Sequence, residues 1–245
     1  MPTETDLTQQ LIEAQRAGRH DLDAVPYSTI DRAAAYRMQV ATMAALGEAP
    51  ALLKTIIAPD GIGTCAPIYR SRVGNSGAFQ LSSPTITGLE VEVGLVLAND
   101  LSSEAANRDD IDIIEAISHY FVGIEVCGTR YADRSLSGAN GGLADNASAY
   151  GYVIDPAHRD AGADIENYDV HLEFAGKQIW SAPGKHSFGT VLNSFIAYAK
   201  AQHPAFPLKA GTVVTTGSLC GLVPTSGTGH VVGRLGNHAV SFDIT

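Results

Sequence analysis

Apolar and polar residues alternate most strictly over residues 89–100, which read LEVEVGLVLAND. A period of two places five apolar side chains on one face of a β-strand, and Glu90 and Glu92 on the other face, followed by Gly94. Two like charges this close repel each other and are costly to bury unpaired, so we expect a cation between them. Gly94, which has no side chain, would leave space for a ligand. The alternative is a half-buried strand whose acidic face is exposed to water.

The rest of the chain shows a few helical patterns and many short strand patterns. Glycine and proline punctuate residues 59–77, which we expect to be an irregular segment that lines or covers a site. Residues 134–144 are rich in glycine and serine and are predicted to be a loop. The expected helices cover residues 4–18, 28–46 and 185–200, and a further helix, capped by Asn107 or Asp109, contains residues 111–117. The expected strands cover residues 89–100, 121–128, 149–155, 168–174, 212–216, 230–235 and 239–244.

These elements predict an α+β fold with a β-rich core and peripheral helices. The strands do not alternate regularly with helices, so the sheet is expected to be mixed or antiparallel. We expect a small helical N-terminal region over residues 1–78, which contains Lys54 and the irregular loop, packed on a β-rich domain over residues 79–245. The apolar face of the N-terminal helices is too narrow to form a separate core.

Composition and charge narrow the range of partners. The chain has 245 residues, of which 45% are hydrophobic and 17% are charged, and its formal net charge is −10. This charge disfavours nucleic acid and anionic membrane surfaces as partners. The three cysteines are scattered without a C-x-x-C pair, and neither a signal peptide nor a membrane-spanning run is visible. We therefore expect a cytoplasmic protein with a small-molecule substrate.

Three glutamates are the strongest candidates for chemistry. Glu90 and Glu92 share a strand face, and Glu125 lies opposite the apolar face of a second predicted strand. Three carboxylates without a paired histidine or cysteine suit a hard ion such as Mg²⁺ or Mn²⁺. The alternative is three unrelated surface glutamates. Lys54 lies inside an apolar run, where desolvation lowers the pKa of a lysine and frees it for proton transfer; a lysine at a strand end is the alternative.

Other polar segments are less specific indicators of a binding site. Residues 145–148, Asp-Asn-Ala-Ser, precede an apolar strand, where their hydroxyl and amide groups can hold a ligand or simply form a turn. Residues 215–218, Thr-Thr-Gly-Ser, end a strand and can present backbone N–H groups to an anion, or form an ordinary turn. His186 is a further candidate. The sequence contains no G-x-S-x-G elbow and no glycine pattern for nucleotide phosphates.

Taken in order along the chain, these segments resemble the fumarylacetoacetate hydrolase superfamily, in the branch of 2-keto-4-pentenoate hydratase and 4-oxalocrotonate decarboxylase. The matching segments are LEVEVGLVLANDL, GIEVCGTRY, LADNASA and VVTTGSLCGLVP. The resemblance implies a rolled mixed sheet, a homo-oligomer, and metal ligation by Glu90, Glu92 and Glu125. It also implies that Lys54 is near the substrate, and that substrate-binding positions include Asn146, Ser148 and Ser218.

The chain departs from this family at two places. The branch often has an aspartate after the proline that follows the lysine, and hydratases are thought to use it, but this chain has Ile68 after Pro67. The branch more commonly has an aspartate and a serine before the arginine of the second segment, where this chain has Cys127, Gly128 and Thr129. Both departures leave the three glutamates in place and leave the reaction open.

The resemblance implies a Mg²⁺-dependent lyase that adds water to a 2-hydroxy-dienoate through a metal-bound enolate, in the catabolism of aromatic compounds. The substrate would be a small anionic 2-oxo or 2-hydroxy acid, and Lys54 would move the proton. Three alternatives stay open. They are a 4-oxalocrotonate-type decarboxylase, an acylpyruvate-type C–C hydrolase, and a catalytically inactive subunit complexed with an active homologous enzyme.

Overall fold

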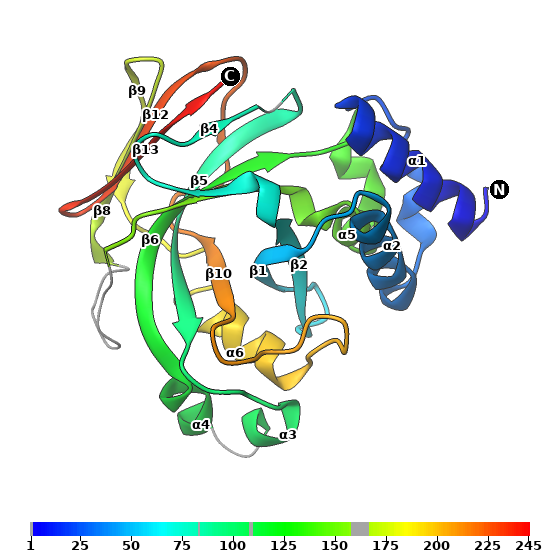
Figure 1. Cartoon of the computed structure of the whole chain (residues 1–245), viewed down its shortest axis with the longest axis horizontal. Coiled ribbons are helices and arrows are strands. Elements are labelled where there is room, and N and C mark those ends of the chain that lie inside the picture. The colour runs from blue at the N-terminus through cyan, green and yellow to red at the C-terminus, as the bar shows by residue number, and fades with distance from the viewer. Residues whose placement is uncertain (1, 83, 108–109, 158–166) are drawn as a thin grey trace.

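The computed structural model describes residues 2–82, 84–107, 110–157 and 167–245. Within these residues the chain forms two β-sheets with helices around the larger one (Figure 1). The larger sheet has the strand order β2-β1-β10-β5-β6-β7-β3, and β11 pairs with β5. Its strands are β1 (Pro50–Ile57), β2 (Gly63–Tyr69), β3 (Val73–Asn75), β5 (Ile86–Leu97), β6 (Ile117–Gly128), β7 (Ala149–Ile154), β10 (Val213–Ser218) and β11 (Val223–Pro224).

The smaller sheet packs against the convex face of the larger one. Its strand order is β4-β13-β12-β8-β9. Apolar side chains of both sheets form one buried cluster, in which Val91 and Ile124 of the larger sheet join Val231 and Phe242 of the smaller one. The strands are β4 (Gln80–Leu81), β8 (Asp169–Phe174), β9 (Lys177–Pro183), β12 (Gly229–Leu235) and β13 (His238–Ile244).

The larger sheet curls so far that strands from opposite ends of its order approach each other. The long strands β5 and β6 sweep around the outside of the curl (Figure 1). Side chains from β1, β2, β6 and β7 meet inside it and form a second apolar cluster. The members of this inner cluster are Leu52, Ile68, Phe121, Ala149 and Tyr152. The concave face therefore surrounds a partly closed interior, as in a β-barrel.

The helices lie outside the curl. The helix α6 packs against β1, β2 and β10, and the hydroxyl groups of Thr55 and Ser194 lie 2.9 Å apart in this interface. The helices α1, α2 and α5 pack together beside the open edge of the sheet (Figure 1). The helices are α1 (Glu4–Ala17), α2 (Arg32–Ala45), α3 (Ser103–Ala106), α4 (Asp110–Glu115), α5 (Gly138–Ala144) and α6 (Asn193–Lys200). Among the described residues, no helix is long and apolar enough to cross a membrane.

The α+β fold class predicted from the sequence is confirmed, as are the two N-terminal helices. Thr3 caps α1 in a capping box with Asp6, and Asp31 caps α2. Residues 236–237 form the hairpin turn that joins β12 to β13, and Gly236 adopts the positive φ of 57° that this turn requires.

The prediction of an irregular segment over residues 59–77 was wrong. This segment contains β2, which pairs antiparallel with β1 along its whole length, and β3, which pairs with β7. Pro67 is tolerated in β2 because β2 is the edge strand of the sheet. Gly63 is needed because a Cβ atom there would lie 2.1 Å from the backbone of Ala197 in α6. Pro67 therefore lies in an edge strand and Gly63 allows close packing against α6, and neither residue marks a loop.

The prediction of a loop over residues 134–144 was also wrong, because this segment contains the helix α5. A Cβ atom at Gly141 would lie 2.9 Å from Tyr27, so the glycine lets the helix approach its neighbour closely. The predicted helix over residues 185–200 is shorter than expected, since α6 begins only at Asn193. The strand β9 was not predicted.

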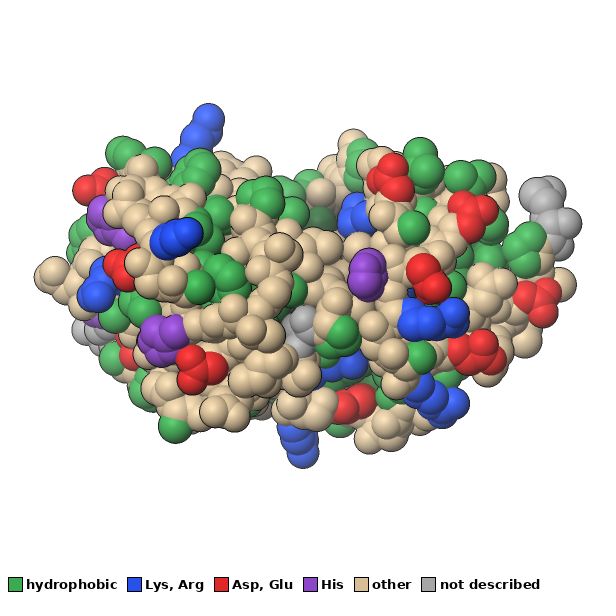
Figure 2. All heavy atoms as spheres, turned by 90° about the horizontal axis from the view of Figure 1, so that it is seen from above, with side chains coloured by type: hydrophobic (Ala, Val, Ile, Leu, Met, Phe, Trp, Pro, Cys, Tyr) green, Lys and Arg blue, Asp and Glu red, His purple; other side chains and the backbone are tan. Residues whose placement is uncertain are grey.

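The strands β1, β2 and β3 belong to the same sheet as β5, β6, β7 and β10. The boundary predicted at residue 78 therefore falls between strands of one sheet. Figure 2 shows acidic and basic side chains interspersed over the face seen from above, without a continuous basic patch.

Candidate functional site

The three glutamates and Lys54 come together on the concave face of the larger sheet. Glu90 of β5 lies directly opposite Glu125 of β6. Lys54 of β1 is paired with Thr215 of β10, which is in turn paired with Gly94 of β5. The register of four neighbouring strands thus places residues from four distant parts of the sequence on one patch of the sheet.

The cation expected between carboxylates is Lys54. Its Nζ atom lies 2.6 Å from Oε1 of Glu125 and 3.3 Å from Oε2 of Glu90. Glu125 is fully buried, and the side chain of Lys54 is only 11% exposed. The pair that Lys54 joins is therefore Glu90 and Glu125 across two strands, whereas the sequence suggested Glu90 and Glu92 along one strand.

Glu92 lies deeper in the curl and contacts neutral groups. The hydroxyl of Thr215 donates a hydrogen bond to Glu92 and lies 3.1 Å from the hydroxyl of Tyr152. Two carboxylate oxygens, Oε1 of Glu92 and Oε2 of Glu125, are buried without a hydrogen-bond partner among the described residues. Buried carboxylate oxygens are normally paired, so these two atoms indicate a missing positive partner.

Burial dominates the electrostatics of this cluster. Burial raises the pKa of Glu92 well above its ordinary value, and the charge of Glu125 raises it further. Burial also raises the pKa of Glu125, against the opposing effect of Lys54. Burial alone would lower the pKa of Lys54, but the charges of Glu125 and Glu90 together outweigh it and hold this pKa well above its ordinary value.

The residues present fit a divalent cation. Three carboxylates against one ammonium leave two negative charges uncompensated when all four groups are ionised. The two unpartnered oxygens supply free acceptors, and the donor set consists of the carboxylate oxygens that Mg²⁺ and Ca²⁺ prefer. One carboxylate oxygen each from Glu90 and Glu125 and the Sγ atom of Cys127 lie within 4.8 Å of one another.

Sequence reasoning missed Cys127 and Tyr152 as members of this site, and it considered residues 215–218 for their backbone N–H groups, whereas the side chain of Thr215 contacts Glu92. The Sγ atom of Cys127 lies 3.4 Å from both Oε2 of Glu90 and Oε1 of Glu125. Cys127 follows Glu125 by two residues in β6, and side chains two residues apart in a strand point to the same face. This spacing could therefore have identified Cys127 as a neighbour of Glu125. Thr215 and Tyr152 gave no such signal, because only the pairing of distant strands brings them to Glu92.

The expectation that Gly94 leaves space for a ligand was wrong. A Cβ atom at Gly94 would lie 2.1 Å from the Phe121 ring, which occupies that space from the neighbouring strand. Gly123 is filled in the same way by the ring of Tyr152. Both glycines accommodate aromatic side chains that close the interior of the curl below the glutamates.

The Asp-Asn-Ala-Ser segment forms a strained turn. Asn146, Ala147 and Ser148 all have positive φ angles, between 51° and 64°, which are uncommon for residues with a side chain. Asp145 supports this turn, since its carboxylate accepts hydrogen bonds from the backbone and side chain of Arg130. Among the described residues, no hydrogen bond joins the side chains of Asn146 or Ser148 to the glutamates.

Ser218 and His186 lie at the end of β10. Ser218 is paired with Glu92 in the sheet register, but its hydroxyl donates to the carbonyl of Gly221 at 3.0 Å and therefore holds a local turn. The Nε2 atom of His186 lies 3.5 Å from the hydroxyl oxygen of Thr216. Burial lowers the pKa of His186 to about 4, so this histidine is neutral near pH 7.

Ile68 is fully buried in the inner apolar cluster. It is paired with Leu52 of β1 and belongs to the same cluster as Phe121 and Tyr152. The position where relatives often have an aspartate is thus an apolar wall in this chain.

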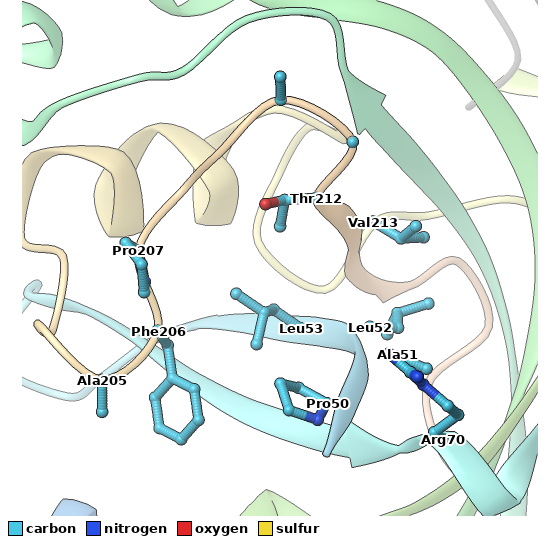
Figure 3. A pocket seen from close by; sticks show the side chains of 12 residues that line it. Pro50, Ala51, Leu52, Leu53, Arg70, Ala205, Phe206, Pro207, Thr212 and Val213 are labelled. Carbon is cyan, nitrogen blue, oxygen red and sulfur yellow. The ribbon is translucent and has the colours of Figure 1, made fainter.

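A pocket of about 460 Å³ lies at the start of β1 and β10, away from the glutamates (Figure 3). Leu52 and Val213 line it from the strands, and the segment 205–212 arches over it (Figure 3). Leu52 also belongs to the inner apolar cluster with Phe121 and Tyr152. None of the three glutamates lines it.

No family model matches the sequence. The chain is 29% identical to 2-keto-4-pentenoate hydratase of Paraburkholderia phymatum, over 69% of this chain and 65% of that protein. The match thus spans slightly less than two thirds of the relative's length.

Solved structures share the fold over all or most of the chain. One is 4-oxalocrotonate decarboxylase from Pseudomonas putida G7, complexed with magnesium and adipate, with a TM-score of 0.81 and 20% identity over 100% of this chain and 99% of that one. A second is 2-hydroxyhepta-2,4-diene-1,7-dioate isomerase from Mycobacterium marinum, with a TM-score of 0.56 and 13% identity over 79% of this chain and 73% of that one. These findings support the resemblance drawn from the motifs: the chain is similar in sequence to a 2-keto-4-pentenoate hydratase and shares its fold with a 4-oxalocrotonate decarboxylase.

Proposed function

We propose that the protein is a Mg²⁺-dependent lyase that adds water to a 2-hydroxy-dienoate, as 2-keto-4-pentenoate hydratase does by name. The observation that carries the proposal is the pairing of Lys54 with Glu90 and Glu125 next to the buried Glu92, with one carboxylate oxygen each of Glu92 and Glu125 left without a partner among the described residues. Glu90, Glu92 and Glu125 would hold the ion. When bound, Mg²⁺ supplies a Lewis acid that stabilises negative charge on the 2-oxygen of the substrate.

Lys54 is the proposed acid–base group. Burial acts to lower the pKa of Lys54, but nearby negative charges, above all those of Glu125 and Glu90, hold this pKa well above its ordinary value. Once the carboxylates share their charge with a divalent cation, burial lowers the pKa of Lys54, and its proton becomes available to a carbon of the substrate. Lys54 lies beside the ligands, so it would be positioned next to a substrate that binds there.

Asn146 and Ser148 would hold the carboxylate of the substrate. Their strained turn is fixed by the buried contact of Asp145 with Arg130, so their side chains would be held at constant positions. The aromatic side chains of Phe121 and Tyr152 close the interior below the glutamates and exclude bulk water. We further propose that the protein works as a homo-oligomer in the cytoplasm, where its cysteines, all free, stay reduced.

Decarboxylation of a 4-oxalocrotonate-type substrate is the second candidate, and Ile68 favours it. Addition of water needs a group that activates the water, and the position where an aspartate is often found is apolar here. Loss of CO₂ needs only the Lewis acid and a proton donor.

Purified protein should be incubated with Mg²⁺ and either 2-hydroxypenta-2,4-dienoate or 4-oxalocrotonate, while loss of dienol absorbance and release of CO₂ are followed. Loss of absorbance with the first substrate supports the hydratase, and CO₂ from the second supports the decarboxylase. Turnover of neither, with intact Mg²⁺ binding, would rule out the lyase and point to an inactive partner subunit. Calorimetry of the Glu92→Gln variant tests the ligands, because Mg²⁺ affinity equal to the wild type would contradict the proposed metal site.

A further inference from the structure

The thiol of Cys127 lies among the carboxylates of the candidate site and has no role in the proposed reaction. Its Sγ atom is 3.4 Å from Oε2 of Glu90 and 3.4 Å from Oε1 of Glu125. Cys127 is a free cysteine and only 2% exposed. A thiol is a weak donor with a single proton, so it cannot donate fully to both oxygens at once. The hydrogen bonds of the thiol therefore do not account for its place between two carboxylates.

The spacing of these three atoms matches the ligands of a tetrahedral ion. Zn²⁺ binds thiolate sulfur at about 2.3 Å and carboxylate oxygen at about 2.1 Å, and a tetrahedral angle then separates the sulfur from the oxygen by about 3.6 Å. The two distances of 3.4 Å from Sγ of Cys127 are close to this value. One ligand atom each from Glu90, Glu125 and Cys127 all lie within 4.8 Å of one another. The three side chains are therefore spaced to ligate one ion.

A second observation points to a cation at the same place. Glu125 is fully buried, and its Oε2 atom has no hydrogen-bond partner among the described residues. The Nζ atom of Lys54 contacts the same two oxygens as the thiol, at 2.6 Å and 3.3 Å, so these oxygens already attract positive charge. The side chains of Lys54 and Glu90 are 11% and 14% exposed, so an ion can reach the cluster from this side.

We propose that Cys127 is an additional metal ligand, through which this site binds thiophilic divalent ions such as Zn²⁺ and Cd²⁺ as well as Mg²⁺. The proposal rests on the proposed function for the assignment of Glu90 and Glu125 as ligands. Thiolate sulfur is a soft ligand that stabilises Zn²⁺, whereas Mg²⁺ prefers oxygen and gains little from sulfur. When Zn²⁺ binds, an S–Zn bond replaces the S–H bond of Cys127, and the proton passes to the buffer.

Absorbance of the Co²⁺-loaded full chain tests the ligand directly. A thiolate ligand gives Co²⁺ an intense charge-transfer band in the near ultraviolet, which oxygen ligands do not give. We expect this band in the wild type and in Cys220→Ser, and we expect Cys127→Ser to lack it. Cys220 is the matched control, because it is a free, partly buried thiol that is not among the three clustered ligand atoms. Absence of the band from the wild type would overturn the proposal, whether or not the variants fold.

Calorimetry with Zn²⁺ and Mg²⁺ measures the preference between ions. The Zn²⁺ affinity of Cys127→Ser should fall by about tenfold or more, because even residues that only orient a metal ligand contribute about 10–100-fold. The Mg²⁺ affinity should be unchanged within error, and Cys220→Ser should match the wild type for both ions. An equal loss of Zn²⁺ and Mg²⁺ affinity in Cys127→Ser would overturn the proposal, because Cys127 would then support the site without ligating the ion.

The outcomes also separate this proposal from the proposed function. If the wild type turns over a dienoate with Mg²⁺ but shows no thiolate band with Co²⁺, this proposal is overturned and the proposed function stands. If the band appears but neither substrate is turned over, the lyase is ruled out and Cys127 remains a metal ligand. If neither Mg²⁺ nor Co²⁺ binds, both proposals are overturned.

Discussion

Replacing Lys54 with methionine removes the cation between two carboxylates of the candidate site. Methionine resembles the aliphatic part of lysine but carries no charge, so Glu125 and Glu90 lose a partner at 2.6 Å and 3.3 Å. Removing one partner of a buried ion pair costs about 3–5 kcal/mol. The side chain of Glu90 is 14% exposed and the carboxylates can bind protons, so we expect the lower end, a loss of about 3 kcal/mol in the free energy of unfolding.

This loss should depend on metal. A divalent cation on the same carboxylates replaces the charge of Lys54, and the variant has no ammonium that competes with the ion. Ligand at 100 times its Kd stabilises a folded protein by about 2.7 kcal/mol. We therefore expect the full deficit of Lys54→Met in EDTA and a much smaller deficit at saturating Mg²⁺.

Urea denaturation followed by circular dichroism measures the loss of unfolding free energy in Lys54→Met, both in EDTA and at saturating Mg²⁺. Lys209→Met is the matched control, since Lys209 pairs with Asp100 where both side chains are more than half exposed, and it should leave the denaturation midpoint unchanged. The reasoning is refuted if Lys54→Met is as stable as the wild type in EDTA, or if Mg²⁺ leaves the deficit unchanged.

Three further predictions concern the surroundings of the site. Asp145→Asn leaves the buried guanidinium of Arg130 without its counter-charge and should cost about 3–5 kcal/mol in urea denaturation; a loss within error would contradict this view of the strained turn. The pKa of His186 is lowered to about 4, so protonation favours the unfolded state, and stability should fall as the pH decreases from 6.5 towards 4. His186→Gln should show a smaller pH dependence over this range. Gly94→Ala forces a methyl group against Phe121 and should cost about 1–3 kcal/mol, and Phe121→Leu in the same chain should restore part of that loss.

The strand that carries Glu90 and Glu92 shows what the alternation of apolar and polar residues can predict. The five apolar residues of this strand are buried in the main apolar cluster, as the period of two requires, and Glu90 and Glu92 lie on the opposite face. Because side-chain direction in a strand is a local property, this assignment needed no knowledge of neighbouring strands.

Glycine and proline misled the prediction where they serve packing. Pro67 lies in an edge strand, and Gly63, Gly141 and Gly142 make room for neighbouring atoms. The sequence alone does not distinguish a glycine that forms a turn from one that allows a close approach, since that difference depends on which distant residue lies opposite.

By itself the sequence predicted the α+β fold class and the candidate site residues, namely three glutamates, a lysine in an apolar run and the Asp-Asn-Ala-Ser segment. Tertiary structure alone decided which of these groups touch. The pairing of β1 with β10 carries Lys54 to Glu90 and Glu125, and the curl of the sheet brings Tyr152 to Thr215 beside Glu92. These contacts depend on the register between strands far apart in the chain, and the packing of the whole core selects that register.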